Sequence, residues 1–82
     1  MMNLQRGSSR PDIVIGDIAI ELKGPTGTNE LKSIADKFVR YTEHYNHLIV
    51  VLFEVNAYDR YYSEWETGMK KNFSGVEIIK KS

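Results

Sequence analysis

Asp12, Glu21 and Lys23 are the residues whose types and spacing could do chemistry. Asp12 begins the apolar run "DIVI", and Glu21 and Lys23 lie at the end of the next run, "IAIELK". Two neighbouring carboxylates supply the oxygen ligands that Mg²⁺ and Mn²⁺ prefer. A lysine beside them can hold a water molecule or stabilise negative charge on a phosphate. A metal ion, a carboxylate pair and a lysine are the parts needed for metal-assisted hydrolysis of a phosphodiester.

A hairpin is expected to position these residues. The pattern predicts strands at residues 12–15 and 18–23, joined by a two-residue turn at Gly16-Asp17. That turn pairs Ile15 with Ile18, so that Asp12 faces Glu21. Alternation then places the charged side chains on one face and only apolar ones on the other, namely Ile13, Ile15, Ile18, Ile20 and Leu22.

The facing carboxylates have two interpretations. Like charges directly opposite each other destabilise a strand pair, and a cation between them would relieve the repulsion. Alternatively, both are solvated charges at the rim of a half-exposed sheet, and Lys23 forms a salt bridge to one of them.

The remaining chain alternates between helical and strand patterns. Thr28 is the expected N-cap of an amphipathic helix that ends near residue 44 or 45. "HLIVVLFEV" has no alternation, which predicts a strand covered on both faces. A second helix is expected over about residues 58–71 and an edge strand over residues 76–80. The order β-β-α-β-α-β predicts an α/β fold with a small mixed β-sheet flanked by helices.

Pro11-Asp12, eight intervening residues and "ELK" resemble the signature of the PD-(D/E)xK nuclease superfamily, which includes restriction endonuclease-like and archaeal Holliday-junction-resolvase-like enzymes. The hairpin, helix and apolar strand follow in the order of that family's core. The resemblance implies an endonuclease that hydrolyses DNA with Mg²⁺ or Mn²⁺. It implies that Asp12, Glu21 and the backbone carbonyl of Leu22 bind the metal, and that Lys23 orients or activates the attacking water.

The chain departs from the family pattern at two points. Several branches have a glutamine in the following helix and a tyrosine four residues later, where this chain has Lys37 and Tyr41. Lys37 either contacts phosphate or is a solvated charge on the helix surface. The usual core also begins with a helix and a further strand, for which residues 1–10 are too few. The chain is therefore either a fragment of a longer protein or a reduced form completed by a second copy.

Two functions stay open at this point: a nuclease, expected to act on DNA as a homodimer, and a nuclease-like interaction or dimerisation module without catalysis. Eleven basic and eleven acidic residues balance, so any nucleic-acid binding must be local. The stripe at Tyr58, Tyr61, Tyr62 and Trp65 is either a base-stacking platform or part of a core or interface.

Length and composition set further expectations. The 82 residues are expected to form one domain, with residues 1–9 as a flexible lead-in. The apolar run at residues 48–53 is too short to span a bilayer, and the N-terminus has no signal-peptide pattern. We therefore expect a cytoplasmic protein without membrane contact. The absence of cysteine excludes disulfides and thiolate zinc sites, and His44 and His47 alone are too few for zinc.

Overall fold

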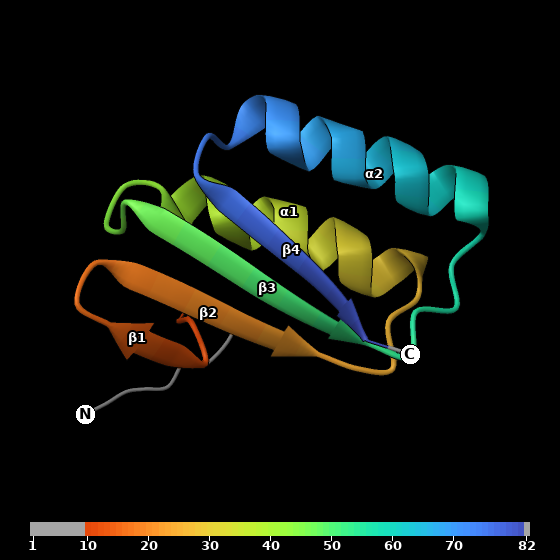
Figure 1. The fold of residues 1–82 in the computed structure, drawn as a ribbon, viewed down its shortest axis with the longest axis horizontal. Helices are drawn as coiled ribbons and strands as arrows, with labels where there is room; N and C mark the ends of the chain where they lie inside the picture. The colour runs from red at the N-terminus through yellow and green to blue at the C-terminus, as the bar shows by residue number, and fades with distance from the viewer. Residues whose placement is uncertain (1–9, 82) are drawn as a thin grey trace.

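The computed structural model describes residues 10–81; residues 1–9, predicted to be a flexible lead-in, and residue 82 lie outside the described residues. Figure 1 shows the elements in chain order as β1 (Ile13–Ile15), β2 (Ile18–Lys23), α1 (Thr28–Tyr41), β3 (His47–Phe53), α2 (Asp59–Asn72) and β4 (Val76–Lys81). The predicted order of strands and helices is confirmed.

The strands form one mixed sheet in the order β1-β2-β3-β4. β1 pairs with β2 antiparallel, whereas β2, β3 and β4 are parallel to one another. The hairpin has the predicted register, in which Ile15 pairs with Ile18 and Ile13 with Ile20. Gly16 has a φ of 60°, a backbone conformation that favours glycine and allows the two-residue turn. The predicted fold class, α/β with a small mixed sheet, is therefore confirmed.

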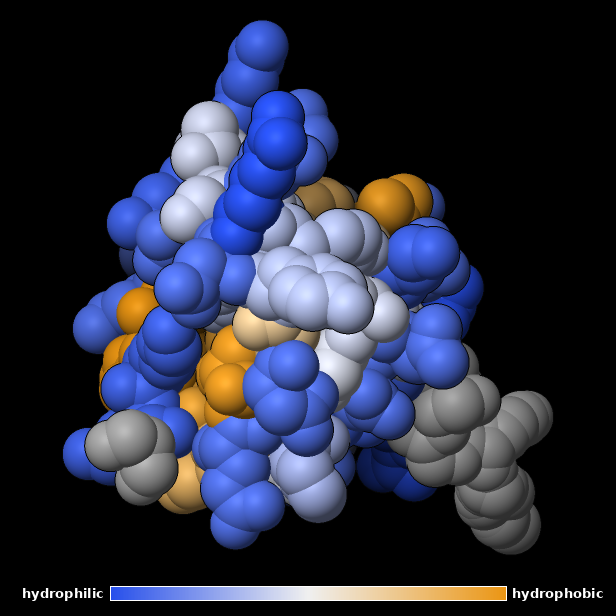
Figure 2. All heavy atoms as spheres, turned by 90° about the vertical axis from the view of Figure 1, so that its right-hand side faces the viewer, coloured by the Kyte–Doolittle hydropathy of each residue, from blue (hydrophilic) through white to orange (hydrophobic). Residues whose placement is uncertain are grey.

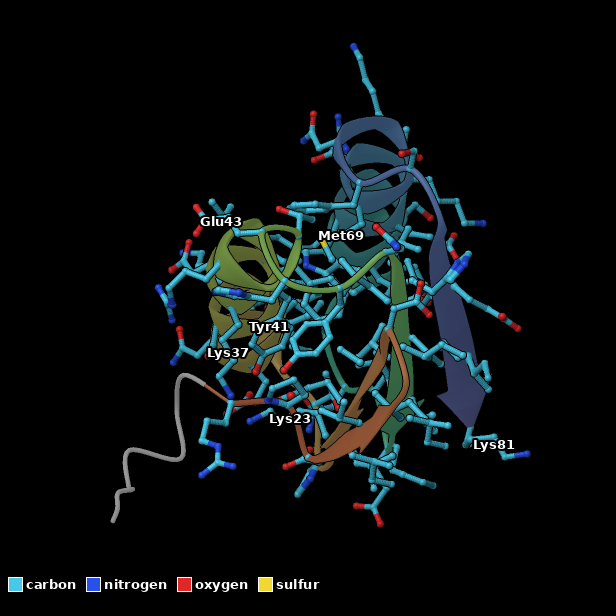
Figure 3. The ribbon with its side chains drawn as sticks, turned by 90° about the vertical axis from the view of Figure 1, so that its left-hand side faces the viewer. Lys23, Lys37, Tyr41, Glu43, Met69 and Lys81 are labelled. Atoms are coloured by element: carbon cyan, nitrogen blue, oxygen red, sulfur yellow. The ribbon has the colours of Figure 1, made fainter. Side chains whose placement is uncertain are left out.

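Both helices lie on the same face of the sheet (Figures 1 and 3). The two parallel connections, β2-α1-β3 and β3-α2-β4, step across the sheet in the same direction. Because such connections are right-handed, two steps in one direction place both helices on one side. The prediction that residues 47–55 are covered on both faces is wrong for this reason. On the other face of β3, Ile49 and Val51 are half-buried and Phe53 is 42 % exposed.

The core lies between this sheet face and the helices. Its buried apolar side chains come from β2, α1, β3 and α2, and they are Ala19, Leu31, Ile34, Phe38, Tyr41, Leu48, Val50, Leu52, Tyr62 and Met69. The helices are also joined by a hydrogen bond of 2.8 Å from Trp65 Nε1 to the carbonyl oxygen of Leu31. Of the aromatic stripe, Tyr62 is buried and Trp65 is half-buried, whereas Tyr58 is 83 % exposed. Most of the stripe therefore serves the core.

α1 begins one residue earlier than expected. Gly27 is the N-cap and Thr28 the first helical residue, so the assignment of Thr28 as the cap is wrong. The side chain of Glu30 supplies the capping interaction by accepting a hydrogen bond of 2.8 Å from the Gly27 N–H. Neither α1 nor α2, the two helices of the described part of the chain, is long and apolar enough to cross a membrane.

Candidate functional site

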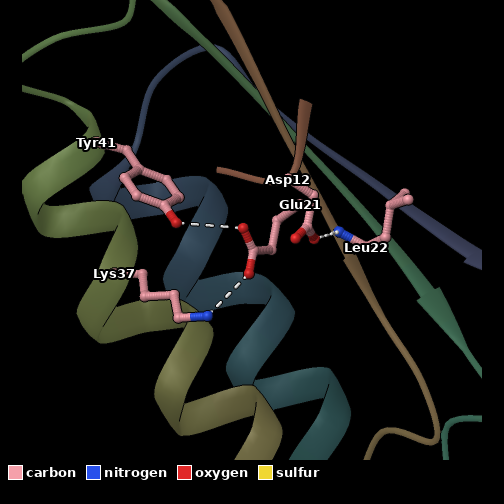
Figure 4. Close-up of polar contacts among 5 residues, drawn as sticks. All are labelled: Asp12, Glu21, Leu22, Lys37 and Tyr41. Atoms are coloured by element: carbon pink, nitrogen blue, oxygen red, sulfur yellow. Dashed lines mark hydrogen bonds and ion pairs between the residues drawn. The ribbon is translucent and has the colours of Figure 1, made fainter. Parts of the chain in front are cut away.

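Asp12 lies beside Glu21 where the hairpin opens, as the register predicts. The pair formed by Ile13 and Ile20 brings the next residues, Asp12 and Glu21, together. Asp12 Oδ2 accepts a hydrogen bond of 2.8 Å from the Leu22 N–H (Figure 4). The N–H and C=O of a strand residue face the same neighbour, so the Leu22 carbonyl faces the side of β2 on which Asp12 lies.

Glu21 is a buried carboxylate with a donor on each oxygen. It is 2 % exposed and lies on the helix-facing side of β2. Its Oε2 lies 2.9 Å from Lys37 Nζ, and its Oε1 accepts a hydrogen bond of 3.2 Å from the Tyr41 hydroxyl (Figure 4). A buried carboxylate requires such partners, because desolvation costs several kcal/mol per ion. The fold therefore stabilises a negative charge inside the protein, at the edge of the core.

Lys37 is a largely covered counter-ion of Glu21, and its interpretation as a solvated charge is wrong. Only 12 % of its side chain is exposed. Lys37 and Tyr41 are four residues apart on α1, so they lie on one face of the helix, and that face packs over Glu21. The i, i+4 spacing was visible in the sequence. The position of α1 over β2, which covers most of the lysine side chain, was not.

The Tyr41 hydroxyl is held in its neutral form. Burial raises the pKa of Tyr41 above the usual value of 10.0, and the charge of Glu21, its hydrogen bond to the hydroxyl and the charge of Asp12 raise this pKa further. A neutral phenol is the form that donates to a carboxylate. Asp12, Glu21 and Tyr41 therefore form one electrostatically connected group.

Lys23 follows Glu21 by two positions in β2, so its side chain leaves the strand on the same face, about 7 Å further along. It is half-buried, and Figure 3 shows it on the side of the molecule where Lys37 and Tyr41 are labelled. Its backbone carbonyl accepts a hydrogen bond of 3.0 Å from the Thr26 hydroxyl, which fixes the end of β2. The structure thus brings Asp12, Glu21, Lys37 and Tyr41 together between the hairpin and α1, and it places Lys23 two positions beyond Glu21 on the same face of β2.

The oxygen donors of this region suit a hard divalent cation, but they are few. Asp12, Glu21 and the Leu22 carbonyl all offer oxygen atoms, the donor type that Mg²⁺ prefers. Within residues 10–81, no group of three or more histidine, aspartate and glutamate side chains is placed to hold a metal ion. The Lys37 ammonium already lies against Glu21 Oε2. A divalent ion would therefore have to compete with Lys37 for this carboxylate.

Comparisons with protein-family models, with curated proteins and with solved structures find no match for this chain. The class that fold and site define is thus an α/β domain with a buried, lysine-paired glutamate beside an exposed aspartate. The resemblance to the PD-(D/E)xK nucleases rests on the motif residues and on their register in the hairpin.

Proposed function

We propose that this protein is a metal-dependent endonuclease that hydrolyses DNA phosphodiester bonds, with Asp12, Glu21 and Lys23 as its catalytic residues. The observation that supports this most is the position of Asp12 beside Glu21, one residue beyond the Ile13–Ile20 pair, where Asp12 Oδ2 accepts a hydrogen bond from the Leu22 N–H. A hairpin that holds two carboxylates together bears the cost of their repulsion. A divalent cation bound between the two carboxylates would offset this repulsion.

Each residue has a role in this proposal. Asp12, Glu21 and the Leu22 carbonyl would hold Mg²⁺ or Mn²⁺, which supplies charge stabilisation and a more acidic bound water. Lys23, on the same strand face as Glu21, would orient the attacking water and offset the charge that develops on the phosphate. Tyr41 keeps its proton and holds the orientation of Glu21 through Oε1.

Lys37 has a position from which it can serve both the free and the DNA-bound protein. Without a metal, its ammonium neutralises Glu21. If Glu21 held a divalent ion, the Lys37 ammonium would be free to pair with phosphate oxygens, for which it is a suitable partner. Because the chain has no net charge, DNA affinity depends on a few such local cations and should fall with rising salt.

The ion pair between Lys37 and Glu21 also favours a second candidate function, an interaction module without catalysis. Glu21 already has one partner from this chain on each carboxylate oxygen, so a metal is not required to make its burial tolerable. In this case the carboxylate and lysine stabilise the contact of α1 with β2, and the domain acts through its surfaces.

Cleavage of labelled single-stranded, duplex and four-way-junction DNA, with Mg²⁺ or Mn²⁺, tests the proposal. We expect metal-dependent cleavage by the wild type and its loss in Lys23→Ala. Lys32→Ala is the matched control, because Lys32 is an exposed lysine on the nearby helix α1. If the wild type cleaves none of the three DNA forms, the nuclease proposal fails and the interaction module is favoured.

A further inference from the structure

The sheet face that points away from the helices forms a continuous apolar surface. Register and alternation place nine apolar side chains on it, and four of them are exposed by 41–60 %. No helix of the described residues covers this face (Figure 1). We call it the open face; its apolar residues are Ile13, Ile15, Ile18, Ile20, Leu22, Ile49, Val51, Phe53 and Ile79.

Two opposite charges lie on the open face along β4. Glu77 and Lys81 share this face with Ile79, because they are two residues before and two residues after it in the strand. Both are exposed. Figure 2, which looks at the end where β2, β3 and β4 finish, shows apolar side chains gathered on one side of that end and bordered by polar ones. Because two residues of a strand span about 7 Å, Glu77 and Lys81 each lie about that distance from Ile79, one on either side of it.

We propose that a second copy of this chain packs on the open face, related by a twofold axis that crosses the strands at Leu22, Val51 and Ile79. These three residues are neighbours across the sheet. Rotation about this axis reverses the strands, so Glu77 meets Lys81 of the partner subunit, and the reciprocal pair forms by symmetry. A twofold interface must be complementary to itself, and equal spacing of opposite charges about Ile79 meets that requirement.

The size of the open face predicts a weak dimer. Four strands about 4.8 Å apart, with about 3.3 Å per residue, present roughly 400 Å². Ile13, Ile15 and Ile18 lie on one side of the axis only, so the rotation leaves them outside the overlap of the two sheets. Two copies would therefore bury less than roughly 800 Å² together, below the ~1,200 Å² at which stable interfaces begin. Sheets that pack face to face lie about 10 Å apart and bury their apolar side chains between them. Asp12, Glu21 and Lys23 lie on the opposite face of the hairpin, so the inference does not depend on the proposed nuclease activity.

Charge exchange tests this arrangement directly. Sedimentation equilibrium of the full chain over a range of concentrations should show a mass rising toward that of a dimer. Glu77→Lys places two ammonium groups against each other, and Lys81→Glu places two carboxylates against each other, so each should weaken the dimer about fivefold. The double variant Glu77→Lys/Lys81→Glu restores both pairs and should return the dissociation constant to that of the wild type.

An apolar site provides the second arm of the test. Phe53→Lys puts a charge within the open face and should abolish the dimer, whereas Val39→Lys is its matched control on α1, where Val39 is 58 % exposed. Circular dichroism establishes that both variants are folded. A wild type that stays monomeric up to about 1 mM would overturn the proposal. So would a double variant that associates no better than the single ones, or a dimer that persists in Phe53→Lys.

Discussion

Lys37 Nζ lies 2.9 Å from Glu21 Oε2, and the two side chains are only 12 % and 3 % exposed. A cation supplied by the chain itself thus occupies the position at which a metal-binding carboxylate would receive its ion. The contact connects the stability of the domain with its proposed chemistry, since any ion that binds Glu21 must replace what Lys37 provides.

Lys37→Met should destabilise the metal-free protein by about 3 kcal/mol, because it leaves the buried Glu21 carboxylate without its counter-ion. Urea unfolding measures this loss. If Glu21 is a metal ligand, addition of Mn²⁺ should raise the free energy of unfolding more in Lys37→Met than in the wild type, where Lys37 already neutralises Glu21. Lys32→Met, at an exposed position of the same helix, should stay within about 0.5 kcal/mol of the wild type.

Two outcomes would contradict this picture in different ways. A loss below about 0.5 kcal/mol in Lys37→Met would mean that the ion pair does not stabilise the fold. If Lys37→Met loses the expected stability and Mn²⁺ does not restore it, the ion pair still explains the stability of the fold, but the metal site is contradicted.

Tyr41 should make the protein sensitive to alkaline pH. Its pKa in the folded state is raised above the unfolded value of 10.0, mainly by burial and then by Glu21. The resulting stability is fully present below about pH 10 and is lost as pH rises toward the folded-state pKa, because the unfolded chain releases the proton first. Tyr41→Phe should flatten the fall in unfolding free energy above about pH 10.

Tyr62 provides the comparison for this experiment. Burial, together with the charge of Glu66 and its hydrogen bond, raises the pKa of Tyr62 as well, so part of the alkaline slope should survive in Tyr41→Phe. Only the double variant Tyr41→Phe/Tyr62→Phe should lose most of it. An unchanged slope in Tyr41→Phe would show that Tyr41 ionises as readily in the folded protein as in the unfolded chain.

Thr26 should matter more for its hydroxyl than for its size. It is fully buried, and its Oγ1 lies 3.0 Å from the carbonyl oxygens of both Lys23 and Phe53, at the ends of β2 and β3. Thr26→Val removes the hydroxyl hydrogen that is shared between these two carbonyls, and it should lower the free energy of unfolding by about 1–3 kcal/mol. Thr26→Ser keeps the donor and should cost less. A valine variant as stable as the wild type would refute this role.

The hairpin could be predicted from the sequence because a two-residue Gly16-Asp17 turn leaves one way to count the pairs. The juxtaposition of Asp12 and Glu21 follows from that count alone. The uncovered sheet face could not be predicted in the same way. An apolar run such as residues 48–53 looks the same whether helices cover one face or both, and the answer depends on strand order, which hydrophobicity does not encode.

The ion pair of Lys37 with Glu21 could not be predicted from the sequence for a related reason. A lysine in the middle of a helix is normally exposed, and its type carries no sign of burial. Only the approach of α1 to β2 gives it a buried partner, Glu21. The N-cap of α1 could not be predicted for a similar reason. Gly27 is the cap instead of Thr28, because the Glu30 side chain folds back and accepts a hydrogen bond from the Gly27 N–H.

Asp12 keeps its place beside Glu21 only while β1 stays paired with β2. β1 has three residue pairs with β2, and all three of its residues are exposed, so it should detach by local unfolding at far less free energy than the core requires. Asp12 would leave with it, while Glu21 would stay buried with α1. Because the Leu22 amide donates to Asp12, its hydrogen exchange with solvent would report how often the two carboxylates are apart.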